Sequence, residues 1–231
     1  AGGALTALAT QHADNRLTIT KRMVGVLGGK APPARAVRLL SAIASLCENE
    51  PTNQIAIAKS GGIQHLITWL VNSSEEVQTQ AAKAMLSIAG NNVTTQASIG
   101  KLGGIPPLVT LIVKGVIEAQ QHSACAVWHL ASLSENRVLL ESAGAIEALV
   151  RLLVAESDVA QQLAVMALLR MAEGSSRVAL KIAQAGGIKL IVNLLSKGSK
   201  ATQQMAAAAL AAAGQVAKNR DVIANANAIS P

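Results

Sequence analysis

The sequence predicts an all-α protein in which a short helical unit repeats about five times and stacks side by side into a superhelix. A Gly-Gly-Ile or Gly-Ala-Ile tripeptide recurs at intervals of 42, 41 and 42 residues, and a period of this length is typical of stacked helical repeats. Behind each tripeptide the apolar residues follow the helical spacing i, i+3, i+4 and i+7. Hydrophobic residues make up 51% of the chain, yet it contains no Phe and no Tyr. Small and branched aliphatic side chains must therefore fill many similar helix interfaces.

The first residue of each tripeptide is predicted to adopt a positive φ. A fifth copy begins with Asn instead of Gly, and Asn is the residue that tolerates the left-handed conformation best after Gly. We therefore expect the preceding helix to end at this residue, as helices often do at a left-handed residue. The five copies begin at Gly61, Gly103, Gly144, Gly186 and Asn227.

A helix of medium length is predicted after each turn, with one buried stripe. Pro106 and Pro107 fall in the first turn of one copy, where a missing N–H costs little. The second position of the stripe is expected to be almost fully buried in every copy. It is occupied by Leu66, Leu108, Leu149 and Ile191.

A longer, Ala-rich helix and then a short helix are predicted to complete each unit. Ser73 and Glu76 have the spacing of a capping box at one long-helix start. Short helices such as 55–60 and 177–185 then lead to the next Gly. The long helices are expected at residues 34–47, 77–89, 119–131, 160–172 and 203–214.

The helix order, the repeat length and the Ala-Gly-Gly-Ile turn resemble the armadillo repeat of catenin-like and importin-like proteins over roughly residues 36–229. The resemblance implies an armadillo-type α-solenoid, a right-handed superhelix of three-helix repeats, as a single domain at 1–231. We expect an N-terminal cap or partial repeat at 1–16, repeats at 17–60, 61–102, 103–143, 144–185 and 186–226, and the start of a further repeat at 227–231.

In the armadillo family, the long third helices commonly form a concave groove that binds an extended peptide. The resemblance therefore implies a non-catalytic scaffold or adaptor for a protein partner. Family members often hold the peptide backbone with Asn and place Trp one turn earlier. Here the Asn positions are occupied by Ser45, Ser87, His129, Arg170 and Ala212, and the Trp positions by Ser41, Lys83, Cys125, Met166 and Ala208. The chain thus departs from nuclear-import adaptors at the residues that carry their activity.

The predicted groove is polar to basic in the first repeats and apolar in the last. Such a surface favours an acidic or acidic–hydrophobic segment, as in the catenin branch. Two alternatives remain: a solvated groove that binds nothing, and an architectural subunit that contacts partners through its outer and terminal surfaces. The candidate binding residues are Arg38, Ser41, Ser45, Gln80, Lys83, Ser87, His122, Cys125, His129, Met166 and Arg170, with Leu163, Met205 and Ala208 at the apolar end.

No catalytic, metal or cofactor site is predicted. His122 and His129 lie two turns apart on one helix face, about 10 Å along the axis, so they cannot meet at one ion with Cys125 between them. The Gly-rich segment 25–31 lacks the Ser or Thr and the preceding strand of a phosphate loop. The paired acids at 75–76 and 156–158 open long helices and complement the helix dipole.

The charge pattern leaves a nucleic-acid or membrane-surface partner as a weaker alternative. The net charge is +7, with an acidic middle at 41–175 between two basic ends. Stacking aromatics, runs of basic residues and amphipathic helices with bulky anchors are missing, and no apolar run spans a bilayer. Cys47 and Cys125 are predicted to be buried free thiols, which favours a reducing intracellular compartment, cytoplasmic or nuclear or both, with an organelle left open.

Overall fold

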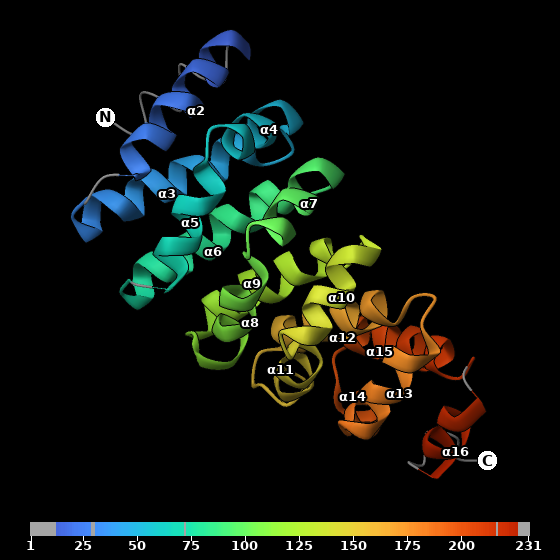
Figure 1. Cartoon of the computed structure of the whole chain (residues 1–231). Coiled ribbons are helices and arrows are strands. Elements are labelled where there is room, and N and C mark those ends of the chain that lie inside the picture. Colours follow the sequence, from blue (N-terminus) through green and yellow to red (C-terminus); the bar gives the residue numbers. More distant parts are fainter. Residues whose placement is uncertain (1–12, 29–30, 72, 216, 226–231) are drawn as a thin grey trace.

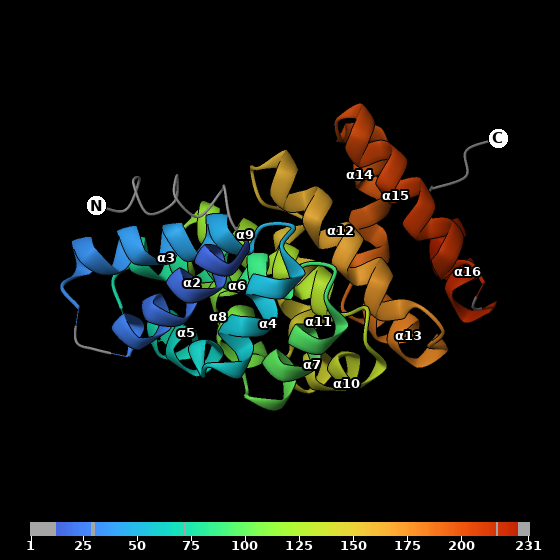
Figure 2. The same cartoon turned by 90° about the horizontal axis from the view of Figure 1, so that it is seen from above.

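The computed structural model describes residues 13–28, 31–71, 73–215 and 217–225, and this part of the chain consists of helices joined by short turns. Successive helices lie next to one another along one direction, with α2 and α16 at opposite ends (Figures 1 and 2). The described residues contain no strand, so the predicted all-α class is confirmed.

Three kinds of helix alternate along the stack. The chain enters through α2 (Ala13–Leu27), which packs against α3, α4 and α5. The long helices are α3 (Pro33–Cys47), α6 (Glu75–Ala89), α9 (Ile117–Leu130), α12 (Asp158–Ala172) and α15 (Lys200–Ala213). The short helices are α4 (Pro51–Lys59), α7 (Val93–Lys101), α10 (Ser134–Ser142), α13 (Ser176–Gln184) and α16 (Ala217–Asn225). The medium helices are α5 (Gly62–Val71), α8 (Ile105–Lys114), α11 (Ala145–Leu152) and α14 (Gly187–Lys197).

The turn before each medium helix has the predicted left-handed backbone. The φ values are 80° at Gly61, 80° at Gly103, 77° at Gly144 and 82° at Gly186. Pro106 and Pro107 stand in the first turn of α8, as expected. Asn227 lies outside the described residues. The sequence period therefore corresponds to a repeated turn between a short helix and a medium helix.

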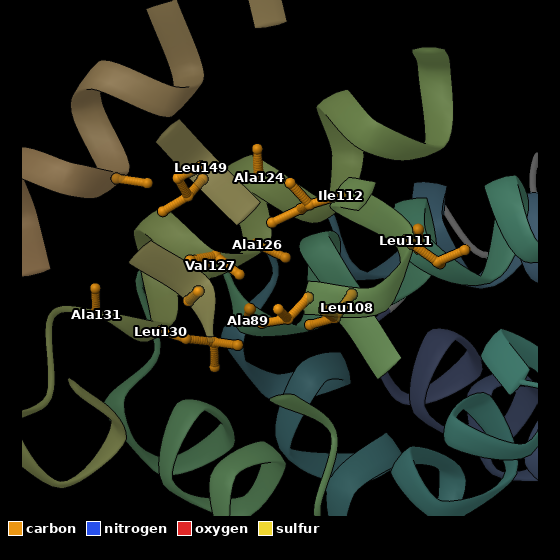
Figure 3. Close-up of a cluster of buried hydrophobic side chains, with 14 of the residues drawn as sticks. Ala89, Leu108, Leu111, Ile112, Ala124, Ala126, Val127, Leu130, Ala131 and Leu149 are labelled. Carbon is orange, nitrogen blue, oxygen red and sulfur yellow. The ribbon is translucent and has the colours of Figure 1, made fainter. Parts of the chain in front are cut away.

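The core is aliphatic and continuous from one unit to the next. Leu66, Leu108 and Leu149 are 0% exposed and Ile191 is 4% exposed, so the predicted register of the medium helices is confirmed. Around α8 and α9 the buried set combines leucines with small side chains such as Ala89 and Ala124 (Figure 3). Small side chains let neighbouring long helices approach closely, which suits the same interface repeated many times.

Buried amides tie the ends of the long helices to the next unit. Nε2 of Gln54 donates to the carbonyl oxygens of Cys47 at 2.9 Å and of Ser87, in the following long helix, at 2.9 Å. Oε1 of Gln54 accepts from Nδ2 of Asn92 at 3.0 Å. In the next unit, Nε2 of Gln96 donates to the carbonyl oxygen of Ala89, the last residue of α6, at 3.0 Å. These bonds satisfy helix-end carbonyls that would otherwise be buried without partners.

Three local expectations were wrong. The residue before α6 is Ser74, not Ser73, and its side chain makes no capping hydrogen bond, so the predicted capping box is not formed. Helix α4 begins at Pro51 rather than near residue 55. Cys47 is buried as expected, but Cys125 is only half-buried because α9 presents it to a surface hollow.

The described helices give no single segment that is long and apolar enough to cross a membrane. Two bent pairs, α7 with α8 and α13 with α14, reach that length and composition only when the two helices are taken together.

Candidate functional site

Two adjoining hollows lie along the long helices in the middle of the stack, and we call them together the groove. The first has a volume of about 540 Å³ and the second about 220 Å³. His129 and Asn91 line both hollows, so the two are continuous. The groove crosses α6, α9 and α12, three successive long helices that pack against one another.

The first hollow brings together five of the residues predicted from the sequence. They come from α6 and α9, whose groove-facing positions are spaced by one helical turn. The turn between α3 and α4 closes one side with Glu48 and Asn49, and the start of α4 adds Pro51 and Gln54. The five predicted residues are Lys83, Ser87, His122, Cys125 and His129.

The two histidines of the groove are held in their neutral form near pH 7. Burial lowers the pKa of His122; Glu118, whose Oε1 lies 3.6 Å from Nε2, partly opposes this, and Lys83 lowers the pKa further. Burial and the nearby Arg170 lower the pKa of His129. The fixed positive charge of the groove is therefore carried by Lys83 and Arg170.

The second hollow contains a cation held over an aromatic ring. The guanidinium carbon of Arg170 lies 5.5 Å from the ring centre of Trp128, within the range of a cation–π interaction. Nε of Arg170 is also 3.5 Å from Oε1 of Glu173, one turn later. The rings of Trp128 and His129 are 4.5 Å apart. A flat aromatic surface and an ordered guanidinium thus meet at the junction of α9 and α12.

Other predicted residues lie outside both hollows. Nε of Arg38 bonds the carbonyl of Ala34 at 3.3 Å, within its own helix. Oγ of Ser45 likewise bonds the carbonyl of Ser41 at 3.2 Å. Gln80 and Met166 are half-buried and line neither hollow. Of the apolar end, Leu163 and Met205 are partly buried against the core, whereas Ala208 is exposed.

Sequence reasoning missed Trp128 and the turn residues that close the groove. Trp128 directly precedes His129, but the groove residues on this helix were expected mainly at the positions that family members use for Asn and Trp, and Trp128 is not one of them. Glu48, Asn49 and Asn91 lie in turns. Their approach to the groove depends on how neighbouring repeats pack, which no local pattern contains.

The thiols of the chain are not activated. Burial raises the pKa of Cys47 to about 12 and also raises the pKa of Cys125, so both are protonated near neutral pH. Within the described ranges, no group of three or more His, Cys, Asp and Glu side chains is arranged to hold a metal ion. What the groove offers chemically is hydrogen bonding, positive charge and a ring surface.

One family model matches the chain, described as the Armadillo/beta-catenin-like repeat, over residues 93–132. The match covers α7, α8 and α9, one unit of short, medium and long helix. Among curated proteins, no sequence match was found.

Solved structures match nearly the whole chain. An engineered protein from the Northeast Structural Genomics Consortium has a TM-score of 0.89 at 27% identity; the match covers 98% of this chain and 57% of that one, so this chain spans little more than half its length. A designed armadillo repeat protein has a TM-score of 0.84 at 25% identity, covering 90% of this chain and 88% of that one. Another designed armadillo repeat protein, in complex with the peptide (KR)4, has a TM-score of 0.83 at 25% identity. The match covers 91% of this chain and 90% of that one.

Proposed function

Because this chain is an armadillo-repeat solenoid, we propose that it is a non-catalytic scaffold that binds a segment of a partner protein in the groove along α6, α9 and α12. The continuity of the two hollows across three repeats carries the proposal. A continuous depression suits an extended chain better than a compact small molecule. The designed armadillo protein in complex with (KR)4 supports a peptide as the class of ligand.

The length of the bound segment follows from the spacing of the long helices. Neighbouring helices pack about 8–10 Å apart, so three long helices span about 20 Å. An extended chain rises about 3.3 Å per residue, so about six residues would cross the groove.

The charge of the groove favours an acidic or acidic–hydrophobic segment. Lys83 and Arg170 carry fixed positive charge and line adjoining hollows, while Glu48 is the single carboxylate among the residues that line them. Trp128 offers a surface for an apolar or planar side chain. A basic peptide such as (KR)4 would place like charges beside Lys83 and Arg170, which is unfavourable.

The test uses fluorescently labelled peptides of about eight residues, one alternating Glu and Leu and one alternating Lys and Leu. Fluorescence anisotropy with the full chain should show tighter binding of the Glu-Leu peptide. The double variant K83E/R170E should weaken that binding by about tenfold or more, because each exposed charge contact contributes about 0.2–1 kcal/mol and each reversal also adds repulsion. Added salt should weaken the binding of the wild type.

A matched control is K114E/K197E, which changes the net charge equally at exposed positions at the ends of α8 and α14. It should retain most of the affinity. If K83E/R170E binds the acidic peptide as the wild type does, groove recognition is wrong. That result would favour an architectural subunit that uses its outer and terminal surfaces.

We further propose a reducing intracellular compartment for the protein. Buried Cys47 and half-buried Cys125 are free, protonated thiols with raised pKa values. Such thiols persist in compartments kept reduced by glutathione and thioredoxin.

A further inference from the structure

Six exposed branched side chains form a row on one edge of the stack, where medium helices turn into long helices. We call this row the valine edge. The residues are Val71, Val113, Val116, Ile117, Val154 and Val159. Val71, Val113 and Val154 occupy equivalent positions near the ends of three medium helices and are 55%, 41% and 65% exposed.

The hydrogen bonds of the described residues bring these turns together. Nε2 of Gln121, one turn into α9, donates to Oγ of Ser157 at the start of α12 with a distance of 2.8 Å. Helix α8 packs against both α5 and α11, so the ends of the three medium helices follow one another. The valine edge is therefore one surface that crosses three repeats, not six isolated residues.

The start of α9 differs from the starts of the two long helices that follow it, although Ser74 before α6 makes no capping bond either. Ser157 and Ser199 cap α12 and α15 by accepting hydrogen bonds from backbone N–H groups. At the equivalent position α9 has Val116, which makes no such bond, followed by exposed Ile117. Val is among the poorest N-cap residues. A poor N-cap residue followed by an exposed isoleucine does not stabilise the helix, so these two side chains are better explained by contact with a partner.

Carboxylates surround the valine edge. The same turns and the first residues of the long helices carry Glu75, Glu76, Glu118, Glu156 and Asp158, against Lys114 and, in the last turn of α11, Arg151. Asp158 also accepts hydrogen bonds from Ser199 and Thr202. In the last repeat the character changes: Ser196 replaces the valine, and Lys200 stands at the position of Glu75 and Asp158. Lys197, like Lys114, ends its medium helix. Apolar exposure and negative charge therefore end together, as expected for one binding surface.

We propose that the valine edge binds a basic amphipathic helix of a partner protein, at a site separate from the groove. Charge complementarity selects a basic occupant. Two copies of this edge facing each other would bring like charges together, which disfavours a symmetric self-interface. Three repeats span about 20 Å, which a helix of about 14 residues covers at 1.5 Å per residue. Its apolar face would cover the valines while lysines or arginines meet the carboxylates.

The experiment uses a labelled peptide of about 14 Leu and Lys residues with the leucines at i, i+3, i+4 and i+7. A second peptide of identical composition lacks this period. Binding to the full chain is measured by fluorescence anisotropy. The periodic peptide should bind more tightly than the aperiodic one, and added salt should weaken its binding.

The deciding variant is V116S/I117D, which copies the Ser157–Asp158 pair that begins α12. It adds a carboxylate, so attraction by charge alone would strengthen binding of the basic peptide. Loss of the apolar contact should instead weaken binding about tenfold or more. The Tm should stay equal or rise, because a serine cap replaces valine. V159S should weaken binding in the same direction through an independent change.

The matched control is V138S, since Val138 is 59% exposed, close to the 53% of Val159, but lies in α10 and outside the valine edge. V138S should leave the affinity for the periodic peptide unchanged. The groove variant K83E/R170E should not weaken binding of this peptide either, which separates the valine edge from the groove. Equal binding of the two peptides would refute the proposal, as would unchanged or tighter binding to V116S/I117D. A dimer in sedimentation velocity that V116S/I117D dissociates would assign the edge to a second copy of the chain and overturn the partner helix.

Discussion

A Cβ atom placed on Gly104 would lie 2.7 Å from Cγ2 of Ile99, five residues earlier in the chain. The relationship recurs: the corresponding distances are 2.5 Å from Gly62 to Ile57 and 2.8 Å from Gly187 to Ile182. In the remaining copy Ala145 occupies the Gly position, and Leu140 stands five residues before it. Leu has no branch at Cβ, so the methyl group that blocks a side chain in the other copies is missing. The Gly or Ala of the tripeptide is thus matched to the side chain five residues earlier, in the last turn of the preceding short helix.

Gly104→Ala should destabilise the protein by about 1–3 kcal/mol, because the added methyl group overpacks the contact with Ile99. The double variant I99L/G104A reproduces the natural pair Leu140 and Ala145. It should recover part of the lost stability, since the φ of −73° at Gly104 suits Ala, while the carbonyl oxygen of residue 99 would still lie 3.2 Å from the new Cβ. Chemical denaturation of the two variants and of I99L alone gives the coupling energy. A coupling energy near zero would show that the two side chains do not compete for this space.

Gly103→Val should cost about 1–3 kcal/mol for a different reason. At Gly103 a Cβ would meet no atom within 4 Å, but the φ of 80° strains any β-branched residue. Gly103→Asn should cost less, because Asn tolerates this region better. Thermal unfolding of the two variants ranks them. Equal losses for Val and Asn would argue against backbone strain as the cause.

Leu149→Ala should lower the free energy of unfolding by about 2–5 kcal/mol, because Leu149 is 0% exposed and its truncation leaves a cavity between repeats. Val154→Ala, at a site 65% exposed a few residues later, should change it by less than about 0.5 kcal/mol. Urea denaturation measures both. A small effect at Leu149 would mean that the medium helices contribute little to the core.

The groove histidines should make stability depend on pH. Burial lowers the pKa of His122 and His129 below 6.5 in the folded chain. The unfolded chain then binds more protons below that pH, so the free energy of unfolding should fall as the pH drops from about 7 to about 5. H122Q/H129Q should flatten this dependence. The carboxyl groups of Glu135, Glu141 and Asp158, whose pKa values are lowered, contribute mainly below this window, because their stabilisation is lost as the pH falls from the unfolded carboxyl pKa toward the folded one. An unchanged slope in the double variant would contradict the assignment.

The sequence predicted features that depend on local spacing and missed those that depend on neighbouring repeats. The apolar period identified Leu108 and Leu149 as core residues, and the tripeptides identified the left-handed turns. The resemblance to the armadillo repeat chose Lys83 and His129, at the family's Trp and Asn positions, and both line the groove. Trp128 and Glu48 were missed because their places in the groove are set by packing across repeats. The capping box at Ser73 failed because its spacing matched a residue one position too early.

The scarcity of aromatic residues gives the protein two built-in optical reporters. With no Tyr in the chain, ultraviolet emission comes from Trp69 and Trp128 alone. Nε1 of Trp69 donates to the carbonyl of Leu27 at 3.3 Å, so its emission reports whether α5 is docked on α2. Trp128 lies in the groove beside His129 and under Arg170, where an arriving ligand changes its polarity and quenching. A W69F variant would leave one fluorophore at the centre of the groove, and occupancy could then be followed by label-free titration.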